Sequence, residues 1–556
     1  MIDADQPFVS LQQLIDPNAF GSQNNQALSQ RLLKAMSVEP ALSSVYDIAF
    51  GQLRLDSRQV MAQDVFVLLQ SQQPNQQQSR NHLNQAAQNA AFILSEIDPA
   101  ILFAQDPVLP NTSLPIDSTL STPSLAVAQR SINNSACPVI YVPAIRDFLG
   151  DLIQARLQYS QAVTLPTVAA VTGTNGKTTI SQLVAQLTQL TGLSSAVMGT
   201  AGNGKLGALV QATHTTGDAL AVQRFLYQIG IEGADLLALE ASSHGLDQQR
   251  LQGVPIKVAI YTNLSRDHLD YHSDMKDYAR AKAKLFDKTH FPSLTHAIIN
   301  TDDEFAPIMI QTAKASELNI WTYSLDASKK ATFNAVDIKP SLQGVEISVE
   351  SEFGKVQVVS PLLGRFNVAN LLAALAAAMA LGIDIERIAT VIPQLQGAAG
   401  RMQRVPSDAG CFIVDYAHTP EALSQVLASL KTHCTGQLWA VFGSGGDRDT
   451  GKRPIMAQAG LAGADRVILT ADNPRSEDPN VILQQMQVGM SAEQYQRTHI
   501  EPARKLAIEY AVKHASADDI VVIAGKGHET YQEIKGVRYD FDDRIVLGQA
   551  LHSKHF

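Results

Sequence analysis

The residues with the clearest chemical potential form a glycine-rich turn, GTNGKTT, at positions 173–179. Gly173 and Gly176 allow a tight turn whose N–H groups face phosphate oxygens, and Lys177 can reach the β- and γ-phosphates of a nucleotide. The Thr178 hydroxyl is then placed to hold Mg²⁺. The general pattern GxxxxGK[ST] would require glycine at position 171, where this chain has Val171. The turn is therefore a variant, and it favours nucleotide binding over a chance turn.

The segments on both sides of this turn predict the elements that must hold it. Apolar residues 168–171 indicate a short buried strand. After Thr179 the apolar residues recur at helical spacing, at Ile180, Leu183, Val184 and Leu187. A strand followed by a turn and a helix is the context in which the helix N-terminus binds phosphate.

Acidic residues and histidines follow two further predicted strands, at 236–242 and 258–264. Glu240 ends the first, where a carboxylate suits Mg²⁺, although a turn or helix-capping acid is the alternative. Asp267, His268, Asp270 and His272 crowd the loop after the second. Such density costs stability through charge repulsion unless a cation or phosphate offsets it, so we expect a metal or phosphate role for His268. Spacing alone assigns Lys282 and Lys284 to a solvated surface.

Three polar loops in the last third of the chain also follow predicted strands. They are FGSGGDRDTGKRP at 442–454, ADNPRSEDP at 471–479 and AGKGHETYQ at 524–532. Loops after parallel strands meet at one sheet edge, where small ligands bind. Arg448 and Arg475 match carboxylates, because guanidinium binds them with two parallel hydrogen bonds, and Glu529 suits an amine. A ligand with both groups is an amino acid.

Composition narrows the class of protein. The 556 residues favour about three or four domains, and 45% hydrophobic content can fill their cores. A net charge of -10 without a basic block argues against nucleic acid as a partner. Three scattered cysteines indicate small buried side chains in a reducing compartment. The chain shows neither a secretion signal nor about 18 uninterrupted apolar residues, so we expect a cytoplasmic protein without a membrane span.

Alternation of short apolar strands with helical segments predicts an α/β protein of three domains, at 1–145, 146–396 and 397–556. In the first, strands at 64–69, 90–96 and 138–142 surround a helical AAQNAA, and Gln72, Gln73 and 76–78 are assigned to a solvated loop. A Pro/Ser-rich insertion spans 106–123. The second has a mostly parallel sheet, a further strand at 297–300 and a buried helix at 364–382. The third is Rossmann-like, with strands at 412–416, 438–443, 466–472 and 519–525.

Eight motifs in order resemble the Mur ligase family over nearly the whole chain. They are GTNGKTT, EASSHGLDQQR, TNLSRDHLDYH, GRFNVANLLAA, VDYAHTPEAL, FGSGGDRDTGKRP, DNPR and AGKGHE. The resemblance implies an N-terminal domain for the UDP end of the substrate, a central ATPase domain and a mobile C-terminal domain for an incoming amino acid. It also implies the use of ATP and Mg²⁺. We expect the protein to be a monomer.

The resemblance implies roles for residues that match the motifs. The implied ATP contacts are Gly173, Thr174, Asn175, Gly176, Lys177, Thr178, Thr179, Asn367, Arg401 and Asp415. The implied Mg²⁺ ligands are Thr178, Glu240, His268 and Lys282, the last as a carbamate. Catalysis would rest on Lys177, Lys282, His268 and Glu240. This reverses the surface assignment of Lys282, because CO₂ addition to its neutral amine would supply an anionic oxygen ligand.

The implied substrate is a UDP-N-acetylmuramoyl dipeptide ending in D-glutamate. Its contacts would be Leu55, Ser57, His214, Thr215, Thr216, Ser242, Gln248 and Arg250, and the family often has Asn where His214 stands. A further uridine-side motif of the family is altered here to Gln72, Gln73 and Pro74. The implied amino-acid site is Arg448, Asp472, Asn473, Pro474, Arg475, Gly525 and Glu529, and its DNPR signature resembles that for meso-2,6-diaminopimelate in place of lysine.

The implied reaction activates the D-glutamate γ-carboxylate as an acyl phosphate and then joins it to the diaminopimelate amine. Two alternatives stay open. Another amide ligase with the same ATPase core, such as folylpolyglutamate synthetase, would lack DNPR and the full N-terminal domain. A phosphate-loop switch or motor would hydrolyse ATP without an amino acid, and would leave Arg448, Arg475 and Glu529 without a shared task.

Overall fold

The computed structural model describes residues 7–15, 44–71, 74–103, 137–159, 161–212, 214–341, 344–407 and 409–554. The insertion at 106–123 and Gln72 and Gln73 lie outside these residues. The described chain forms two compact units. Unit 1 comprises 1–166, 216–235 and 244–255, and unit 2 comprises 167–215, 236–243 and 256–556. The three domain ranges set out above stay a prediction.

Unit 1 is built on a four-stranded parallel sheet in the order β1-β2-β3-β4. The strands are β1 (Leu53–Arg54), β2 (Val65–Leu68), β3 (Phe92–Ser95) and β4 (Val139–Tyr141). Helices α1 (Leu11–Ile15), α4 (Pro99–Leu102), α5 (Leu149–Gln158) and α7 (Ala219–Ile231) belong to the same unit. Its core includes Phe50 and Phe92, whose rings meet edge to face, and Tyr227 of α7.

One local prediction in unit 1 is wrong. Gln76–Gln78 do not belong to a solvated loop, because they open helix α3 (Gln76–Ala86). The Asn75 side chain accepts the backbone N–H of Gln78 and so caps the helix start. Glutamine is a good helix former, which the polar composition concealed. The segment AAQNAA contributes only its first residue, Ala86, to that helix.

The larger sheet of unit 2 has ten strands in the order β14-β13-β12-β11-β10-β9-β5-β8-β6-β7. Its parallel centre contains β5 (Thr167–Thr172), β8 (Leu236–Glu240), β9 (Ile256–Tyr261) and β10 (His296–Asn300), which confirms the predicted strands. The other strands are β6 (Ser195–Gly199), β7 (Gly202–Lys205), β11 (Asn319–Ser324), β12 (Phe333–Ser341), β13 (Gly344–Ser351) and β14 (Gly354–Ser360). The antiparallel run β12–β14 was not predicted.

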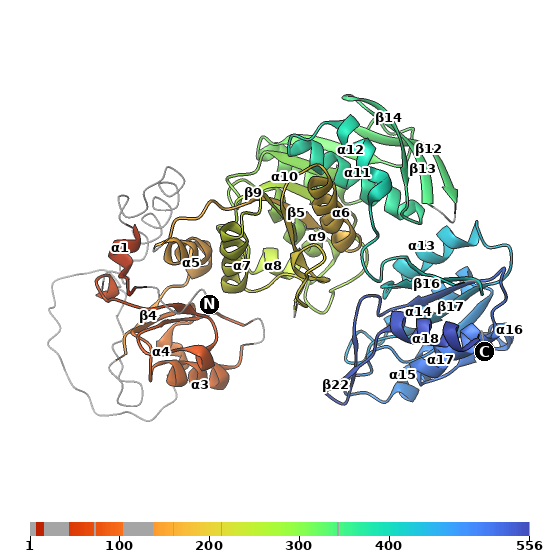
Figure 1. Cartoon of the computed structure of the whole chain (residues 1–556). Coiled ribbons are helices and arrows are strands. Elements are labelled where there is room, and N and C mark those ends of the chain that lie inside the picture. Colours follow the sequence, from red (N-terminus) through yellow and green to blue (C-terminus); the bar gives the residue numbers. More distant parts are fainter. Residues whose placement is uncertain are drawn as a thin grey trace. The chain divides into compact units, whose positions relative to one another are not determined.

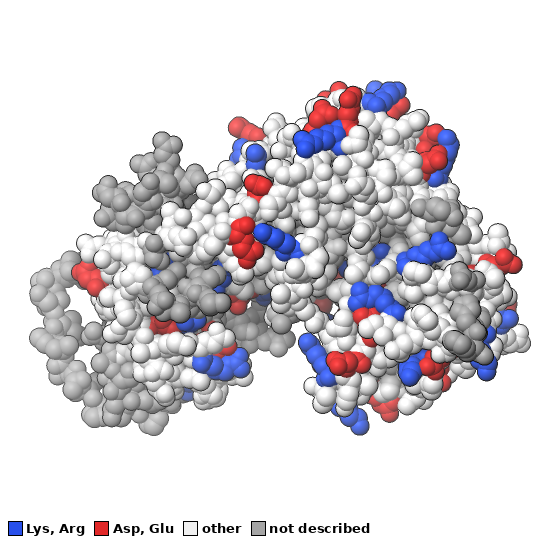
Figure 2. Space-filling view, viewed as in Figure 1, with Lys and Arg blue, Asp and Glu red and all other residues white. Residues whose placement is uncertain are grey.

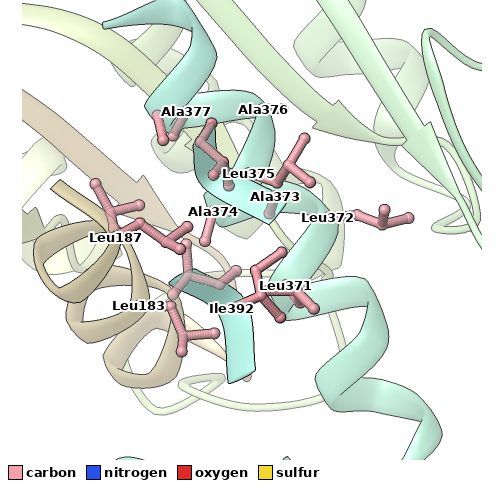
Figure 3. Close-up of a cluster of buried hydrophobic side chains, with 14 of the residues drawn as sticks. Leu183, Leu187, Leu371, Leu372, Ala373, Ala374, Leu375, Ala376, Ala377 and Ile392 are labelled. Atoms are coloured by element: carbon pink, nitrogen blue, oxygen red, sulfur yellow. The ribbon is translucent and has the colours of Figure 1, made fainter. Parts of the chain in front are cut away.

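Two helices bury this sheet's core beside the glycine-rich turn. Helix α6 (Lys177–Leu190) follows the turn, and α11 (Arg365–Ala380) contributes a nearly continuous buried Ala/Leu surface. Figure 3 shows Leu183 and Leu187 of α6 facing Leu371 and Ala374 of α11. Small alanines let two helix backbones approach closely, so the packing holds the start of α6 in place. The α11 helix ends at Ala380, and Gly382, the glycine expected to stop it, follows the cap residue with φ of +95°.

A six-stranded sheet of unit 2 has the order β15-β16-β20-β17-β18-β19. The strands are β15 (Gln403–Val405), β16 (Cys411–Asp415), β17 (Leu438–Phe442), β18 (Arg466–Leu469), β19 (Thr498–Ile500) and β20 (Ile520–Ala524). All pairs except β15–β16 are parallel. The hairpin β21 (Tyr531–Ile534) and β22 (Val537–Asp540) follows β20.

Helices cover both faces of the six-stranded sheet. One face packs on α13 (Pro420–Lys431), α14 (Lys452–Gly463) and α15 (Pro479–Met486), and the other on α17 (Arg504–His514) and α18 (Asp543–Lys554). The remaining short helices are α8 (Ser243–Asp247), α9 (Met275–Ala283), α10 (Ala306–Ala315), α12 (Ile385–Val391) and α16 (Ala492–Gln496). Figure 1 shows these elements, and the α/β fold class with parallel-rich sheets is confirmed.

Charged side chains of both signs lie on the surface of the molecule. On the face shown in Figure 2, basic and acidic side chains are interspersed, without a broad basic area. Within the described ranges, every helix is too short or too polar to cross a membrane. Cys137, Cys411 and Cys434 are thiols that are not joined in disulfides, and burial raises the pKa of Cys137 to about 11.

Candidate active site

The glycine-rich turn connects β5 to α6 in a conformation that its glycines make possible. Gly173 has φ of +149° and Gly176 has φ of +89°. A Cβ atom at Gly173 would lie 1.9 Å from Thr262 Oγ1, and one at Gly176 would lie 2.6 Å from Asn370 Oδ1. Both glycines are therefore required by backbone conformation and by close packing.

The polar residues after β9 hold the turn from its other side. Asn263 accepts the N–H of Thr174 on its backbone oxygen at 2.7 Å and the N–H of Asn175 on Oδ1 at 3.0 Å. The Thr262 hydroxyl donates to Asn175 O at 2.6 Å. These two turn N–H groups are thus occupied by Asn263, and they fix the loop.

The first turn of α6 supplies the remaining donors. Gly176 is the N-cap of α6, and in the described chain no side chain caps that helix start. The first N–H groups of a helix have no partner within the helix, and its N-terminus carries partial positive charge. The helix start is therefore the part of the turn best arranged to bind phosphate.

Two lysines converge on one carbonyl of the turn. Lys177 Nζ donates to Gly173 O at 2.9 Å and to Thr174 O at 2.8 Å, while Lys282 Nζ donates to Gly173 O at 2.7 Å. Burial lowers the pKa of Lys177, an effect that the charges of Glu240 and Asp267 oppose. Burial and the like charge of Lys177 hold the pKa of Lys282 well below its ordinary value. Lys282 is only 1% exposed, so spacing alone assigned it wrongly to a solvated surface.

Glu240 is fixed beside the turn because β8 pairs with β5. The register sets Glu240 opposite Val171. Its Oε1 accepts the N–H of Thr200 at 2.9 Å, and its Oε2 lies 3.1 Å from Thr200 Oγ1, which is 3.0 Å from Thr215 Oγ1. A Cβ at Gly199 would lie 2.1 Å from Glu240 Oε1, so the small residue makes room for the carboxylate.

His268 and Asp267 occupy the loop after β9. His268 has φ of +54°, and its Nε2 lies 3.7 Å from Asp267 Oδ2. Its ring meets Tyr278 of α9 edge to face, and Tyr278 also lies under the Lys282 ammonium. Burial would raise the pKa of Asp267, but nearby positive charges, His268 first among them, hold it below its ordinary value. Asp267 faces both lysines electrostatically, a role that the motif did not assign.

The other predicted ATP residues lie on helix α11, on the connection before β15 and on strand β16. Asn367 in the first turn of α11 donates to Leu363 O and accepts from Asn370, the residue packed on Gly176. Arg401 Nη2 lies 3.4 Å from Thr178 Oγ1. Asp415 ends β16 and accepts the N–H groups of Met402 and Ala417, each at 2.7 Å. Burial raises the pKa of Asp415.

The protein side chains near the turn would hold a metal ion only if a bound phosphate supplied further oxygen ligands. Across the ranges described above, no three His, Cys, Asp or Glu side chains gather closely enough to hold a metal ion. Magnesium usually takes one or two carboxylates and completes its shell with water and substrate phosphates. The buried Glu240 carboxylate and the Thr178 hydroxyl at the start of α6 are oxygen donors of that kind.

The predicted UDP-substrate residues fall in both units. In unit 1, Arg250 donates to Gln248 Oε1 at 2.8 and 3.0 Å and to Thr216 O at 3.0 Å, so these three come together. Also in unit 1, the buried Ser57 Oγ lies 2.9 Å from His82 Nδ1 and 2.8 Å from Gln85 Oε1, and Leu55 is half-buried. Unit 2 carries Thr215 beside Thr200, together with His214 and Ser242.

The predicted amino-acid residues come together at the carboxyl ends of β17, β18 and β20. Arg475 Nη1 donates to Gly446 O at 2.6 Å, and the N–H of Gly446 donates to Asn473 O at 2.9 Å. Asn473 Nδ2 donates to Glu529 Oε2 at 2.8 Å. A Cβ at Gly525 would lie 2.4 Å from Asp472 Oδ2. Arg448 is exposed at the edge of this group, and Pro474 packs on Gly446.

Lys526 is a member of this group that the sequence argument left without a task. It is fully buried, and its Nζ donates to Glu529 Oε2 at 2.8 Å and to Asn473 Oδ1 at 3.1 Å. Glu529 therefore already has a cationic partner, and an incoming amine would share it. The sequence signal that could have identified Lys526 was the position of a lysine between two glycines in AGKGHE.

The chain is similar to known proteins in sequence and in fold. A model of the Mur ligase middle domain matches residues 171–378, and a model of the Mur ligase glutamate ligase domain matches 400–527. A relative from Vibrio vulnificus, named UDP-N-acetylmuramoyl-L-alanyl-D-glutamate--2,6-diaminopimelate ligase, is 39% identical over 507 residues, which cover 91% of this chain and 95% of the relative. One of the same name from Pseudomonas aeruginosa is 46% identical, covering 68% and 77% respectively.

A solved structure of a UDP-N-acetylmuramoyl-L-alanyl-D-glutamate--2,6-diaminopimelate ligase shares the fold. It is 42% identical, with a TM-score of 0.66, and the match covers 99% of this chain and 100% of that one. Fold and site together define a phosphate-loop α/β protein with a separate Rossmann-like ligand site. The chain belongs to the Mur ligase family.

Proposed function

We propose that this protein is the ATP-dependent ligase that adds meso-2,6-diaminopimelate to UDP-N-acetylmuramoyl-L-alanyl-D-glutamate in peptidoglycan precursor synthesis. The observation that carries the proposal is the convergence of Arg475, Asn473 and Glu529 on one loop cluster. That cluster offers guanidinium for carboxylates and a carboxylate for an amine on the same edge of the sheet. The likeness to ligases of this name over nearly the full chain supports it.

ATP would bind with its phosphates at the start of α6. Lys177 would exchange the two turn carbonyls for phosphate oxygens, which attract its ammonium more strongly. Asn367, Arg401 and Asp415 complete the proposed nucleotide contacts. Bound Mg²⁺, held by Thr178, Glu240 and His268, would supply charge neutralisation at the phosphates.

The proposed reaction has two steps. The substrate's γ-carboxylate oxygen attacks the γ-phosphorus, the bond to the β-phosphate oxygen breaks, and ADP leaves. The neutral amine of diaminopimelate then attacks the acyl carbon, phosphate leaves with the bonding electrons, and the amine loses a proton. Because both partners of the first step are anions, its rate would depend on the charge of Lys177 and on alignment of the reactants.

Lys282 is proposed to be carbamylated. Its amine would attack CO₂, an N–C bond would form, and a proton would leave to give an anionic carbamate. Burial beside Lys177 favours the neutral amine that this step needs. The negative charge would then face Lys177 and a bound cation, and Lys282 would give up its hydrogen bond to Gly173 O. The mass of the intact chain, read with and without bicarbonate, tests this modification.

For the UDP-dipeptide, we propose contacts within unit 1. Arg250, Gln248 and Thr216 form one preassembled group that suits a carboxylate or carbonyl of the muramoyl peptide. Leu55 and Ser57 are proposed for the uridine end. We also propose that the protein acts as a monomer in the cytoplasm, which light scattering of the purified protein and fractionation of cells test.

Phosphate release tests the proposed function directly. The full chain is supplied with ATP, Mg²⁺ and UDP-muramoyl dipeptide, and release is compared with diaminopimelate, with lysine and with no amino acid. A site that uses its arginines for the distal carboxylate should prefer diaminopimelate by about 10⁴-fold or more in kcat/KM. Equal use of lysine would refute the specificity, and release without any amino acid would favour a switch or motor.

A second arm separates the other amide ligase. Folate-type acceptors replace the UDP-muramoyl dipeptide, and glutamate replaces diaminopimelate. The proposal expects no phosphate release in this arm, because Arg250 and its partners would meet no muramoyl peptide. Release with the folate acceptor alone would support the alternative.

A further inference from the structure

Two loops at the proposed amino-acid site are joined along their length. Residues 443–451 follow β17 and include Arg448, and residues 470–478 follow β18 and include Arg475. Gly446 contacts the second loop so closely that a Cβ there would lie 2.0 Å from Pro474 O. Asp447 accepts the Ser476 hydroxyl at 2.5 Å, and its N–H donates to Glu477 Oε1 at 2.6 Å. The loops bearing Arg448 and Arg475 are therefore joined by close packing and by two hydrogen bonds.

A buried arginine lies beneath this junction. Arg453, in the first turn of α14, is 0% exposed, and it donates from Nη1 to Glu477 Oε2 at 2.8 Å and from Nη2 to Glu477 Oε1 at 2.7 Å. Nη2 also donates to Gly445 O at 3.3 Å, and Nη1 to Gln485 of α15. One guanidinium thus joins both loops to two helices.

We propose that Arg453, acting through Glu477, is a positioning residue that sets the separation of Arg448 and Arg475 and thereby the preference for an amino acid with a distal carboxylate. The inference rests on the proposed function, because it assigns diaminopimelate to these arginines. Neither Arg453 nor Glu477 needs to contact the ligand. Their task is to fix the positions of the loops from which the side chains of Arg448 and Arg475 extend.

The geometry requires arginine in particular. A guanidinium presents its donors in a rigid fork that matches both oxygens of a carboxylate, whereas an ammonium is a point charge on a flexible stem. Lysine at 453 would keep the charge but could not reach Glu477 Oε1, Glu477 Oε2 and Gly445 O in one arrangement. The Arg453→Lys variant therefore separates the effect of the side chain's charge from the effect of its shape.

Discrimination is the property most sensitive to this separation. Diaminopimelate differs from lysine by one distal carboxylate, so its advantage exists only while a guanidinium meets that group in the correct place. A displacement of about 1 Å can cost about 100-fold in rate. Lysine does not use the distal contact, so its slower reaction should change much less.

The test compares Arg453→Lys, Arg453→Met and Glu477→Gln in the full chain. For each variant, kcat and KM are measured with diaminopimelate and with lysine. We expect KM for diaminopimelate to rise about tenfold to 100-fold, kcat at saturation to change less than about threefold, and the ratio of the two kcat/KM values to fall at least about tenfold. The ratio of the two kcat/KM values should fall in Arg453→Lys as it does in the other two variants.

Arg497→Met is the matched control. Arg497 donates to Ala464 O and Leu461 O, each at 2.6 Å, at the opposite end of the same helix α14. It holds structure in the same domain but touches neither arginine-bearing loop. Its preference for diaminopimelate over lysine should equal that of the unaltered protein, even where its melting temperature falls.

The outcomes separate this inference from the function on which it rests. If the unaltered protein does not use diaminopimelate, the proposed function fails. If it does, and the folded Arg453 and Glu477 variants keep its full preference over lysine, the inference is overturned. Should Arg453→Met not fold, Arg453→Lys and Glu477→Gln decide the question, because each keeps a polar side chain of similar volume.

Discussion

The glycine-rich turn and the arginine-bearing loops hold their cationic side chains in opposite ways. At the turn, Lys177 and Lys282 donate only to backbone carbonyls of the turn itself among the contacts described above. At the loops, Arg475 is held by Gly446 on one side and by the β21 strand on the other, where its N–H donates to Glu533 O at 2.9 Å. Beneath it lies the Arg453–Glu477 ion pair.

The difference indicates how each site gains its ligand. A lysine bound to neutral carbonyls can exchange them for a phosphate, since hydrogen bonds between two charged groups are stronger. Arg475 is held in place without a ligand, which lowers the entropic cost of binding and sharpens selection by shape. The turn is thus suited to phosphoryl transfer, and the loops are suited to recognition of the amino acid.

The largest expected effect comes from Lys177→Ala at the turn. We expect phosphate release to fall at least about 10³-fold, because no other group would replace its charge at the transferring phosphoryl group. Stability should change by less than about 2 kcal/mol, since only two hydrogen bonds to carbonyls are lost. Phosphate release and thermal unfolding measure the two effects, and substantial remaining turnover would refute the assignment.

Gly446→Ala should separate the arginine-bearing loops. The new Cβ would lie 2.0 Å from Pro474 O, so the loops must part. We expect KM for diaminopimelate to rise about 100-fold and stability to fall by about 1–3 kcal/mol. Gly451→Ala is the control, because Gly451 has right-handed helical backbone and its Cβ would only approach the Asp449 side chain. Equal behaviour of the two variants would contradict the close packing.

The Arg453–Glu477 pair should make the stability of the protein depend on pH in the acid range. The hydrogen bond from Arg453 lowers the pKa of Glu477 to about 2, against an ordinary value of 4.5. A lowered carboxyl pKa stabilises the fold above the ordinary value, and this contribution is lost as pH falls toward the folded-state value. The melting temperatures of the unaltered protein and Glu477→Gln should therefore converge between about pH 5 and pH 2. A constant difference would show that the charge of Glu477 contributes nothing.

The smallest expected effect lies away from both sites. Gly548 is in helix α18, and a Cβ there would meet nothing within 4 Å. Gly548→Ala should therefore stabilise the protein by about 0.5–1 kcal/mol, because alanine loses less entropy in a helix. Activity should stay unchanged. Chemical denaturation measures the gain, and a loss of stability would reveal a contact of α18 that the packing does not show.

Local patterns in the sequence predicted the elements that carry most of the candidate site. The strand before the glycine-rich turn, the helix after it and the strands ending at Glu240 and Asp415 were found from apolar runs and turn residues. These signals are local, since each depends on neighbouring residues. The strands β12–β14 were not predicted, because they are stabilised by antiparallel pairing with each other. The sequence of a single segment does not reveal such pairing.

The sequence by itself determined the chemical groups: a phosphate turn with its lysine, acids after strands, and two arginines with an acid in the last domain. Only the tertiary structure decided their partners. It showed Asn263 occupying two turn N–H groups, Lys282 buried against Gly173, and Arg453 beneath the arginine-bearing loops. The reason is physical: residue types set which contacts are possible, but burial and hydrogen-bond geometry arise when distant segments pack together.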